Sequence, residues 1–90
     1  MNNTMLTISF KVTFIKQVNK LEKELIDEVF ERIELLKNDE NHKILKVHKL
    51  HGKLSSCFSF SVNYNTRIVF EYLTKNEIIL LFIGGHDIYK

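Results

Sequence analysis

The 90-residue sequence contains no proline, no tryptophan, three glycines and a single cysteine, Cys57. One cysteine excludes an internal disulfide, and its place in an alternating segment predicts a small buried or half-buried side chain without a catalytic role. No segment reaches the roughly 18 consecutive apolar residues of a membrane span. The first residues, Met1 to Met5, lack the charged region and following apolar region of a targeting signal. We therefore expect one cytoplasmic domain, residues 1–90, with no membrane contact.

Charge is unevenly distributed along the chain, although the formal net charge is only +2. Residues 1–40 hold 6 Lys and Arg against 8 Asp and Glu, whereas residues 41–90 hold 7 against 3. All four histidines also lie in the later part. This pattern indicates that the later half faces a partner. So small a difference does not by itself indicate nucleic-acid binding.

Four segments predict β-strands. Residues 5–10, 57–64 and 67–72 alternate between apolar and polar side chains, which is typical of strands with one buried face. Residues 77–83 are apolar on both faces, which predicts a central strand. The connections between the last three segments are short. They predict antiparallel pairing, because parallel neighbours need a crossover of about a dozen residues or more.

Two helices are predicted between the first strand and residue 40. Apolar residues at helical spacing predict a short helix that begins near Phe14 and ends near Asn19, with Ser9 or Thr13 as its cap. A longer amphipathic helix follows over residues 21–36, and its apolar stripe predicts a core face. Asn38 is expected to end this helix as a left-handed cap.

The order of these elements predicts an α+β fold. Two N-terminal helices would pack on one face of a four-stranded, largely antiparallel sheet. The opposite face of the sheet would remain as a shallow concave surface. The chain is too short to enclose a large active site, so any site is expected at the polar ends of the strands.

Residues 42–53, HKILKVHKLHGK, form a basic connection between the second helix and the next predicted strand. Its apolar residues are expected to anchor the segment to the core, and Gly52 permits a turn. The lysines would then project towards a polyanion: Lys43, Lys46, Lys49 and Lys53.

Histidine and arginine in the later half match the needs of RNA cleavage without a metal. The substrate's 2′-hydroxyl can act as nucleophile if a base deprotonates it, an acid protonates the leaving oxygen and a cation holds the phosphate. Imidazoles, which ordinarily titrate near pH 6.5, serve as base or acid, and a guanidinium grips two phosphate oxygens. His48, His86 and Arg67 supply this set. The H-x-x-H pair His48 and His51 with Cys57 matches no established set of four zinc ligands, so we expect no metal and no cofactor.

Three motifs carry a family resemblance that covers nearly the whole chain. HKLHGKL begins at His48, SFSVNYNTRIVFEY begins at Ser59 and IGGHDIY ends at Tyr89. In this order they resemble the RelE/YafQ branch of bacterial toxin–antitoxin toxins, within the RelE/ParE superfamily. The resemblance implies a RelE-like fold and an endoribonuclease that cleaves messenger RNA and inhibits translation. It also implies a cognate antitoxin protein as partner. Because the expected site is too open to position RNA tightly by itself, we expect the messenger RNA to be held in the ribosome.

The resemblance assigns roles residue by residue. His48 and His86 match functional histidines of YafQ-like members, Arg67 matches the RelE-like arginine, and Tyr89 matches an aromatic residue near the C-terminus that stacks on or activates the substrate. The sequence departs from the family at Ser61 and Asn65, where YafQ-like members have a histidine and an acidic residue. The expected catalytic set is His48, Arg67, His86 and Tyr89. The expected RNA-binding set is Lys46, Lys49, His51 and Lys53.

Each assignment has a structural alternative. His48 and His51 could cap a turn, Arg67 could pair with Glu71 on the same strand face, and Tyr89 could close the edge of the core. At the level of function, two alternatives remain. One is a ParE-like toxin that inhibits DNA gyrase without cutting RNA, and the other is an inactive interaction module on the same fold.

Overall fold

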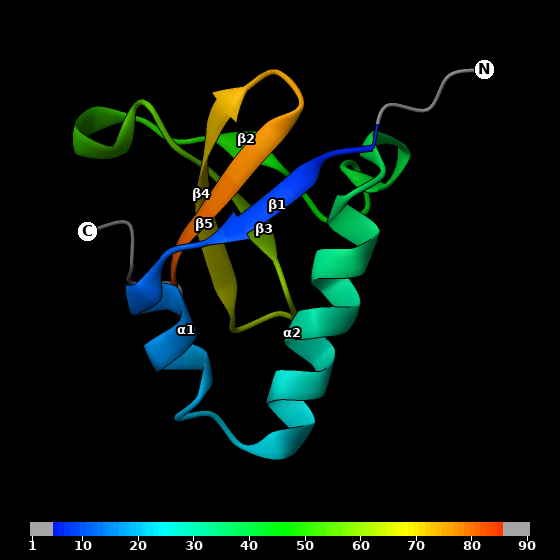
Figure 1. The fold of residues 1–90 in the computed structure, drawn as a ribbon, viewed down its shortest axis with the longest axis vertical. Helices are drawn as coiled ribbons and strands as arrows, with labels where there is room; N and C mark the ends of the chain where they lie inside the picture. Colours follow the sequence, from blue (N-terminus) through cyan, green and yellow to red (C-terminus); the bar gives the residue numbers. More distant parts are fainter. Residues whose placement is uncertain (1–4, 86–90) are drawn as a thin grey trace.

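A mixed five-stranded sheet forms the centre of the structure, a computed structural model that describes residues 5–85 (Figure 1). The spatial order of the strands is β1-β5-β4-β3-β2; β1 runs parallel to β5 and the other pairs are antiparallel. β5 lies between β1 and β4, as its apolar sequence predicts. The strands are β1 (Thr7–Phe10), β2 (His48–Lys49), β3 (Phe58–Ser61), β4 (Arg67–Thr74) and β5 (Glu77–Gly84).

The predicted α+β class is confirmed, but the sheet has five strands where the sequence predicts four. The additional strand is β2, which pairs His48 with Ser59 and Lys49 with Phe58 at the edge of the sheet. Two residues are too few to show a period-two pattern, so this strand is invisible in a search for alternation. β2 thereby places His48, a predicted catalytic residue, on the sheet itself.

Two helices cover one face of the sheet, α1 (Val12–Val18) and α2 (Lys23–Leu36). Two short 3-10 turns follow, η1 (Asp39–Asn41) and η2 (Gly52–Leu54). Phe14 and Val18 of α1 and Val29, Ile33 and Leu36 of α2 are buried against the strands, as the apolar stripes predict. Within residues 5–85, neither helix has the length and apolar character needed to cross a membrane.

Side chains of α1 hold the end of β5. The pairing of β4 with β5 skips Leu81, a β-bulge that leaves this residue outside the regular ladder. The Thr13 hydroxyl donates to the Leu81 carbonyl (3.1 Å), and the Ile83 amide donates to the Gln17 side chain (2.9 Å). Thr13 is therefore not the cap of α1, which is Lys11, and neither is Ser9. The helix instead supplies partners to backbone groups beside the bulge.

The prediction that Asn38 adopts a left-handed conformation is wrong. Its φ is −102°, and its side-chain oxygen accepts a hydrogen bond from the Glu40 amide, which begins η1. Among the described residues, the positive φ angles belong to Lys46 (58°) and Gly52 (69°). Gly52 makes the turn that the sequence predicts. Lys46 adopts this conformation despite its Cβ, and its carbonyl is used in the site described below.

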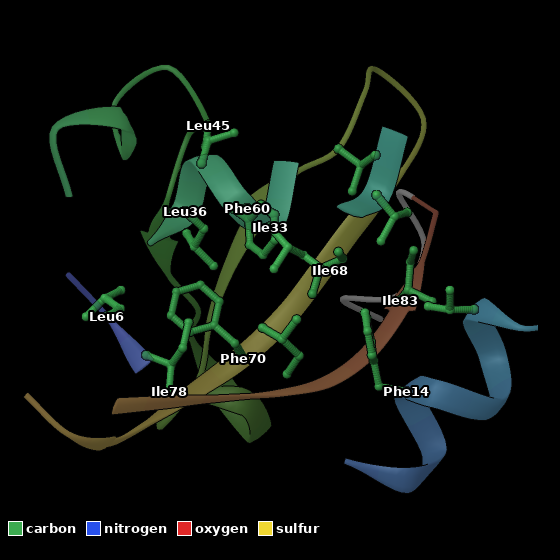
Figure 2. Packing of buried hydrophobic residues seen from close by; sticks show 14 residues of the cluster. Leu6, Phe14, Ile33, Leu36, Leu45, Phe60, Ile68, Phe70, Ile78 and Ile83 are labelled. Atoms are coloured by element: carbon green, nitrogen blue, oxygen red, sulfur yellow. The ribbon is translucent and has the colours of Figure 1, made fainter. Parts of the chain in front are cut away.

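Phe70 lies at the centre of the core between the sheet and the helices (Figure 2). Its ring centroid is 5.8 Å from Phe58, 5.9 Å from Phe60 and 5.7 Å from Tyr72, within the range of favourable aromatic pairs. Phe70 and Phe60 are completely buried. The aromatic rings of β3 and β4 thus join the two strands on the helix side of the sheet.

Phe70→Ala should lower the free energy of unfolding by about 3–5 kcal/mol, because it removes the central ring and leaves a cavity in a small core. Leu73→Ala, at a position on β4 that is 56% exposed, is the matched control and should change it by less than about 0.5 kcal/mol. Urea denaturation followed by circular dichroism measures both. Equal losses in the two variants would contradict the placement of Phe70.

Candidate active site

The pleat of β3 sends serine side chains to the face of the sheet opposite the helices. Phe58 and Phe60 point into the core, so Ser59 and Ser61 alternate to the other face. Ser59 pairs with His48 of β2, and Ser61 pairs with Arg67 of β4. Residues directly opposite each other in a ladder share a face, so His48 and Arg67 lie on the same side of the sheet. Standard strand spacing and rise place their Cα atoms roughly 12 Å apart.

This face is not as bare as the sequence predicts. Leu50, Cys57 and Val69 form a second, smaller buried cluster, against which Leu54, Leu81 and Phe82 pack. The segment that contains η2 therefore covers part of the sheet opposite the helices. Cys57 is buried in this cluster, in agreement with the predicted structural role.

His48 is oriented through both ring nitrogens. Nδ1 lies 2.9 Å from the carbonyl oxygen of Lys46, and Nε2 lies 3.5 Å from the hydroxyl of Ser59. Because a carbonyl oxygen only accepts, the Nδ1 contact requires a proton on Nδ1. A neutral ring then carries its lone pair on Nε2, the nitrogen on the side of Ser59. The left-handed backbone of Lys46 thus selects which nitrogen of His48 can act as a base.

Arg67 holds the loop between β3 and β4. Its Nη1 atom donates to the carbonyl oxygens of Asn63 (2.8 Å), Tyr64 (3.0 Å) and Thr66 (3.2 Å). The alternative in which Arg67 pairs with Glu71 is wrong: within residues 5–85 the ion pairs are Lys23–Asp27 and Lys37–Glu34. The remaining donors of the guanidinium, on Nη2 and Nε, are held in a fixed orientation by these three contacts.

Two hollows adjoin the His48 segment, and they divide the predicted RNA-binding residues. The first, of about 350 Å³, is lined by His48, Lys49, His51 and two leucines, and we call it the His51 hollow. The second, of about 310 Å³, is lined by Lys46, Arg67 and Arg32 among others, and we call it the Arg32 hollow. Lys53 is exposed on η2. Lys46 and Lys49 thus belong to different hollows.

Two predicted catalytic residues, His86 and Tyr89, lie outside the described residues. Their roles stay predictions. The last residue of β5, Gly84, pairs with Arg67, and His86 follows Gly84 by two positions in the sequence.

Among the described residues, a pKa is displaced at Tyr72. Burial raises the pKa of the Tyr72 phenol above its usual value, and the carboxylate of Asp39 raises it further. Tyr72 packs against Phe58 and Phe70 on the helix side of β4. This phenol stays neutral at physiological pH and is separated by the sheet from His48 and Arg67. In the same part of the chain, no three histidine, cysteine or acidic side chains gather closely enough to bind a metal ion.

Sequence reasoning missed Ser59 and Arg32. Ser59 is fully buried although it lies on the polar side of an alternating strand, where burial has no sequence signal. Arg32 lies within the amphipathic helix α2, where a charged residue is ordinarily taken as solvent-facing. Only the tertiary arrangement shows that Arg32 lines the same hollow as Arg67 and Lys46.

Comparison with known proteins identifies the fold. No family model and no curated protein sequence matches the chain. Several solved structures are similar over nearly the whole chain, among them the following three. A conserved hypothetical protein from Helicobacter pylori has 24% identity and a TM-score of 0.67, with 91% of this chain and 96% of that chain covered. A chain of the archaeal RelE–RelB complex from Pyrococcus horikoshii has 14% identity and a TM-score of 0.73, with 93% and 98% covered. YafQ from E. coli has 17% identity and a TM-score of 0.70, with 90% and 93% covered.

These likenesses show that the chain has the fold of RelE and YafQ. The structural part of the resemblance drawn from the sequence is therefore confirmed. At such low identity a shared fold does not establish a shared activity, so function has to be argued from the site.

The hydrogen bond from His48 to Lys46 makes a spectroscopic prediction. At a pH where the ring is neutral, His48 should be present as the Nδ1–H tautomer, because the Lys46 carbonyl accepts that proton. Two-bond ¹H–¹⁵N correlation spectra of the imidazole nitrogens measure this directly. His51 is exposed and serves as the internal control, with a mixture of tautomers expected. A predominantly Nε2–H form of His48 would show that the contact is not made in solution.

Proposed function

We propose that this protein is the toxin of a toxin–antitoxin system and an endoribonuclease that cleaves messenger RNA. The observation that carries this proposal is the shared face of the sheet, where His48 is oriented through its Nδ1 contact with the Lys46 carbonyl and Arg67 lies two strands away. General base and phosphate-binding cation are two of the three groups that metal-free RNA cleavage needs. The fold of RelE and YafQ supports the toxin role.

In the proposed reaction, Nε2 of His48 removes the proton from a ribose 2′-hydroxyl. The 2′-oxygen attacks the adjacent phosphorus, and the bond from phosphorus to the 5′-oxygen breaks. The products are a 2′,3′-cyclic phosphate and a 5′-hydroxyl. Arg67 neutralises charge on the phosphate through the donors that its loop contacts leave available. His86 is assigned as the acid that protonates the leaving oxygen, and Tyr89 as the residue that stacks on a base, from the family resemblance.

Two partners belong to the same proposal. His48 is exposed on a two-residue edge strand, so we infer that the site by itself positions RNA weakly. We infer that the ribosome presents the messenger RNA and supplies the missing orientation, which also places the protein in the cytoplasm. Similar structures include toxin–antitoxin complexes, RelE–RelB among them. An acidic antitoxin segment that covers the basic surface is the corresponding partner here.

Expression of the protein alone in bacteria should arrest growth, and co-expression of its cognate antitoxin should restore it. The expected cause is loss of translation, measured by incorporation of labelled amino acids within minutes of induction. Full-level expression of soluble protein without a growth defect would contradict the toxin role. Arrest with intact messenger RNA and inhibited gyrase supercoiling would replace the nuclease by the ParE-like alternative, in keeping with the similarity to a YoeB/ParE toxin from Agrobacterium tumefaciens.

His48→Gln and His86→Gln should each lower messenger-RNA cleavage by at least 100-fold, because positioned acid–base groups contribute about 10²–10⁴-fold. For Arg67, lysine is a better substitute than alanine. It keeps the charge near the loop carbonyls while removing the bidentate guanidinium, and a loss of about 100-fold is expected. Primer extension on cleaved messenger RNA measures the rates.

The control for these variants is His42→Gln. The His42 ring contacts the Leu36 carbonyl at the end of α2 (2.9 Å), outside the proposed site. This variant should cut at close to the wild-type rate, and circular dichroism melts should show that all four proteins are folded. Folded His48 and His86 variants that cut as fast as the wild type would refute the assignment.

A further inference from the structure

The Arg32 hollow holds two positive charges that the cleavage mechanism does not use, Arg32 and Lys46, beside Arg67, which it does use. Arg32 reaches it from α2, Lys46 from the segment before β2, and Arg67 from the start of β4. Ser61 and the loop residues Asn63 and Tyr64 complete its polar rim. No acidic residue lines it among the described residues. The carboxylate of Glu28, one helical turn before Arg32, is engaged by the side-chain amide of Asn63 (3.0 Å).

Arg32 is the most informative of these residues. Its Nε atom is buried and has no hydrogen-bond partner within the described part of the chain. Such a group is unfavourable inside a protein unless an acceptor reaches it. The side chain also lines a hollow that is open to solvent, so an anion that enters there can pair with the charge of the guanidinium.

Arg67 lines the same hollow, and its guanidinium is held in a fixed orientation. Three backbone carbonyls of the loop hold Nη1, so little side-chain freedom remains to be lost when a ligand binds. A guanidinium binds phosphate oxygens in a two-pronged manner. The hollow therefore combines the preoriented guanidinium of Arg67, the guanidinium of Arg32, whose buried Nε has no acceptor among residues 5–85, and the exposed charge of Lys46.

Tyr64 indicates which anion fits. Its side chain is 82% exposed at the rim of the hollow. Exposed aromatic rings beside positive charges are the usual platform for the bases of single-stranded nucleic acid, on which a base stacks while its phosphate is neutralised. An acidic protein segment would use the charges but would have no use for the ring. The arrangement thus favours a nucleotide over a carboxylate.

We propose that Arg32 and Lys46 form a subsite for the backbone phosphate that neighbours the scissile one in single-stranded RNA, with Arg67 between the two phosphates and Tyr64 stacked on the adjoining base. Lys46 connects the subsite to the chemistry, because its carbonyl orients His48 while its side chain lines the hollow. Binding of this phosphate in the hollow determines which nucleotide of the RNA lies beside His48. The inference rests on the proposed function in taking RNA as the ligand.

The test measures binding without cleavage. The probe is a fluorescein-labelled octaribonucleotide that is fully 2′-O-methylated and so has no nucleophile. Fluorescence anisotropy across a salt series compares the wild type with Arg32→Gln, Arg32→Lys and the control Lys75→Gln. Lys75 is exposed in the turn between β4 and β5, at the end of β4 away from Arg67. Melting curves confirm that each variant is folded.

Arg32→Gln should weaken binding about tenfold and make the slope of log K against log salt less negative by about 0.7, the loss of one phosphate contact on a single strand. Arg32→Lys should restore the slope but only part of the affinity. Tyr64→Ala should also lose about tenfold, whereas Tyr64→Phe should bind like the wild type. Lys75→Gln should stay within twofold. On cleavable RNA, Arg32→Gln should raise KM and leave kcat unchanged, as expected for a residue that only positions the substrate.

Arg32→Gln and Lys75→Gln with the same affinity and salt slope would overturn the subsite. A second outcome would also overturn the subsite: an octaglutamate peptide binds in a manner that depends on Arg32, whereas binding of the RNA probe does not depend on Arg32. That result would assign the hollow to an acidic protein partner. The two proposals fail separately. A wild type that cuts no RNA but binds the probe through Arg32 would refute the nuclease and keep the subsite. Cleavage with an unchanged KM in Arg32→Gln would refute the subsite and keep the nuclease.

Discussion

The two-residue alternation of β3 and β4 is the constraint on which the rest of the structure depends. Phe58 and Phe60 face the helices, so Ser59 and Ser61 must face away from them. A slip of one residue in the register would exchange these sets, exposing two phenylalanines and burying two serines. The large apolar area of the aromatic rings makes this exchange very unfavourable. The core thereby fixes the positions of His48 and Arg67, although neither residue belongs to it.

Backbone groups, more than side-chain pairs, hold the site in place. His48 is oriented by the Lys46 carbonyl, and Arg67 is held by three carbonyls of the loop before it. On β5, Thr13 of α1 satisfies the carbonyl of the bulged residue Leu81. Backbone carbonyls have fewer free torsions than side chains, so they orient a side chain at small entropic cost. It follows that substitution of Arg67 alters the loop as well as the chemistry.

Elements with a repeating pattern of apolar residues can be predicted from the sequence, whereas features that depend on one or two residues cannot. The strands around Phe60 and Phe70 and the helix that ends at Leu36 follow from periodicity, and the structure has them. β2 did not follow, because two residues carry no period. The left-handed Lys46 did not follow either, since lysine has no preference for that conformation and only the surrounding contacts impose it. His48 was identified from its chemistry and the family resemblance, but its orientation required Lys46.

Arg32 shows why a fold of this kind can be recognised while its chemistry cannot be transferred. Solved structures at 14–24% identity share the sheet and helices, because many apolar sequences satisfy the same layers. The Arg32 hollow depends on a different condition: a charged residue of α2 must lie beside the loop that Arg67 holds. Nothing in the packing of the core requires that arrangement, since position 32 lies at the margin of the apolar stripe. The buried Nε of Arg32 has no hydrogen-bond partner within residues 5–85, which weakens the fold slightly, and an anion that pairs with the guanidinium offsets that disadvantage. The residues that distinguish one member of this fold from another are therefore expected at the margin between core and surface, where stability tolerates variation and a bound phosphate can reach.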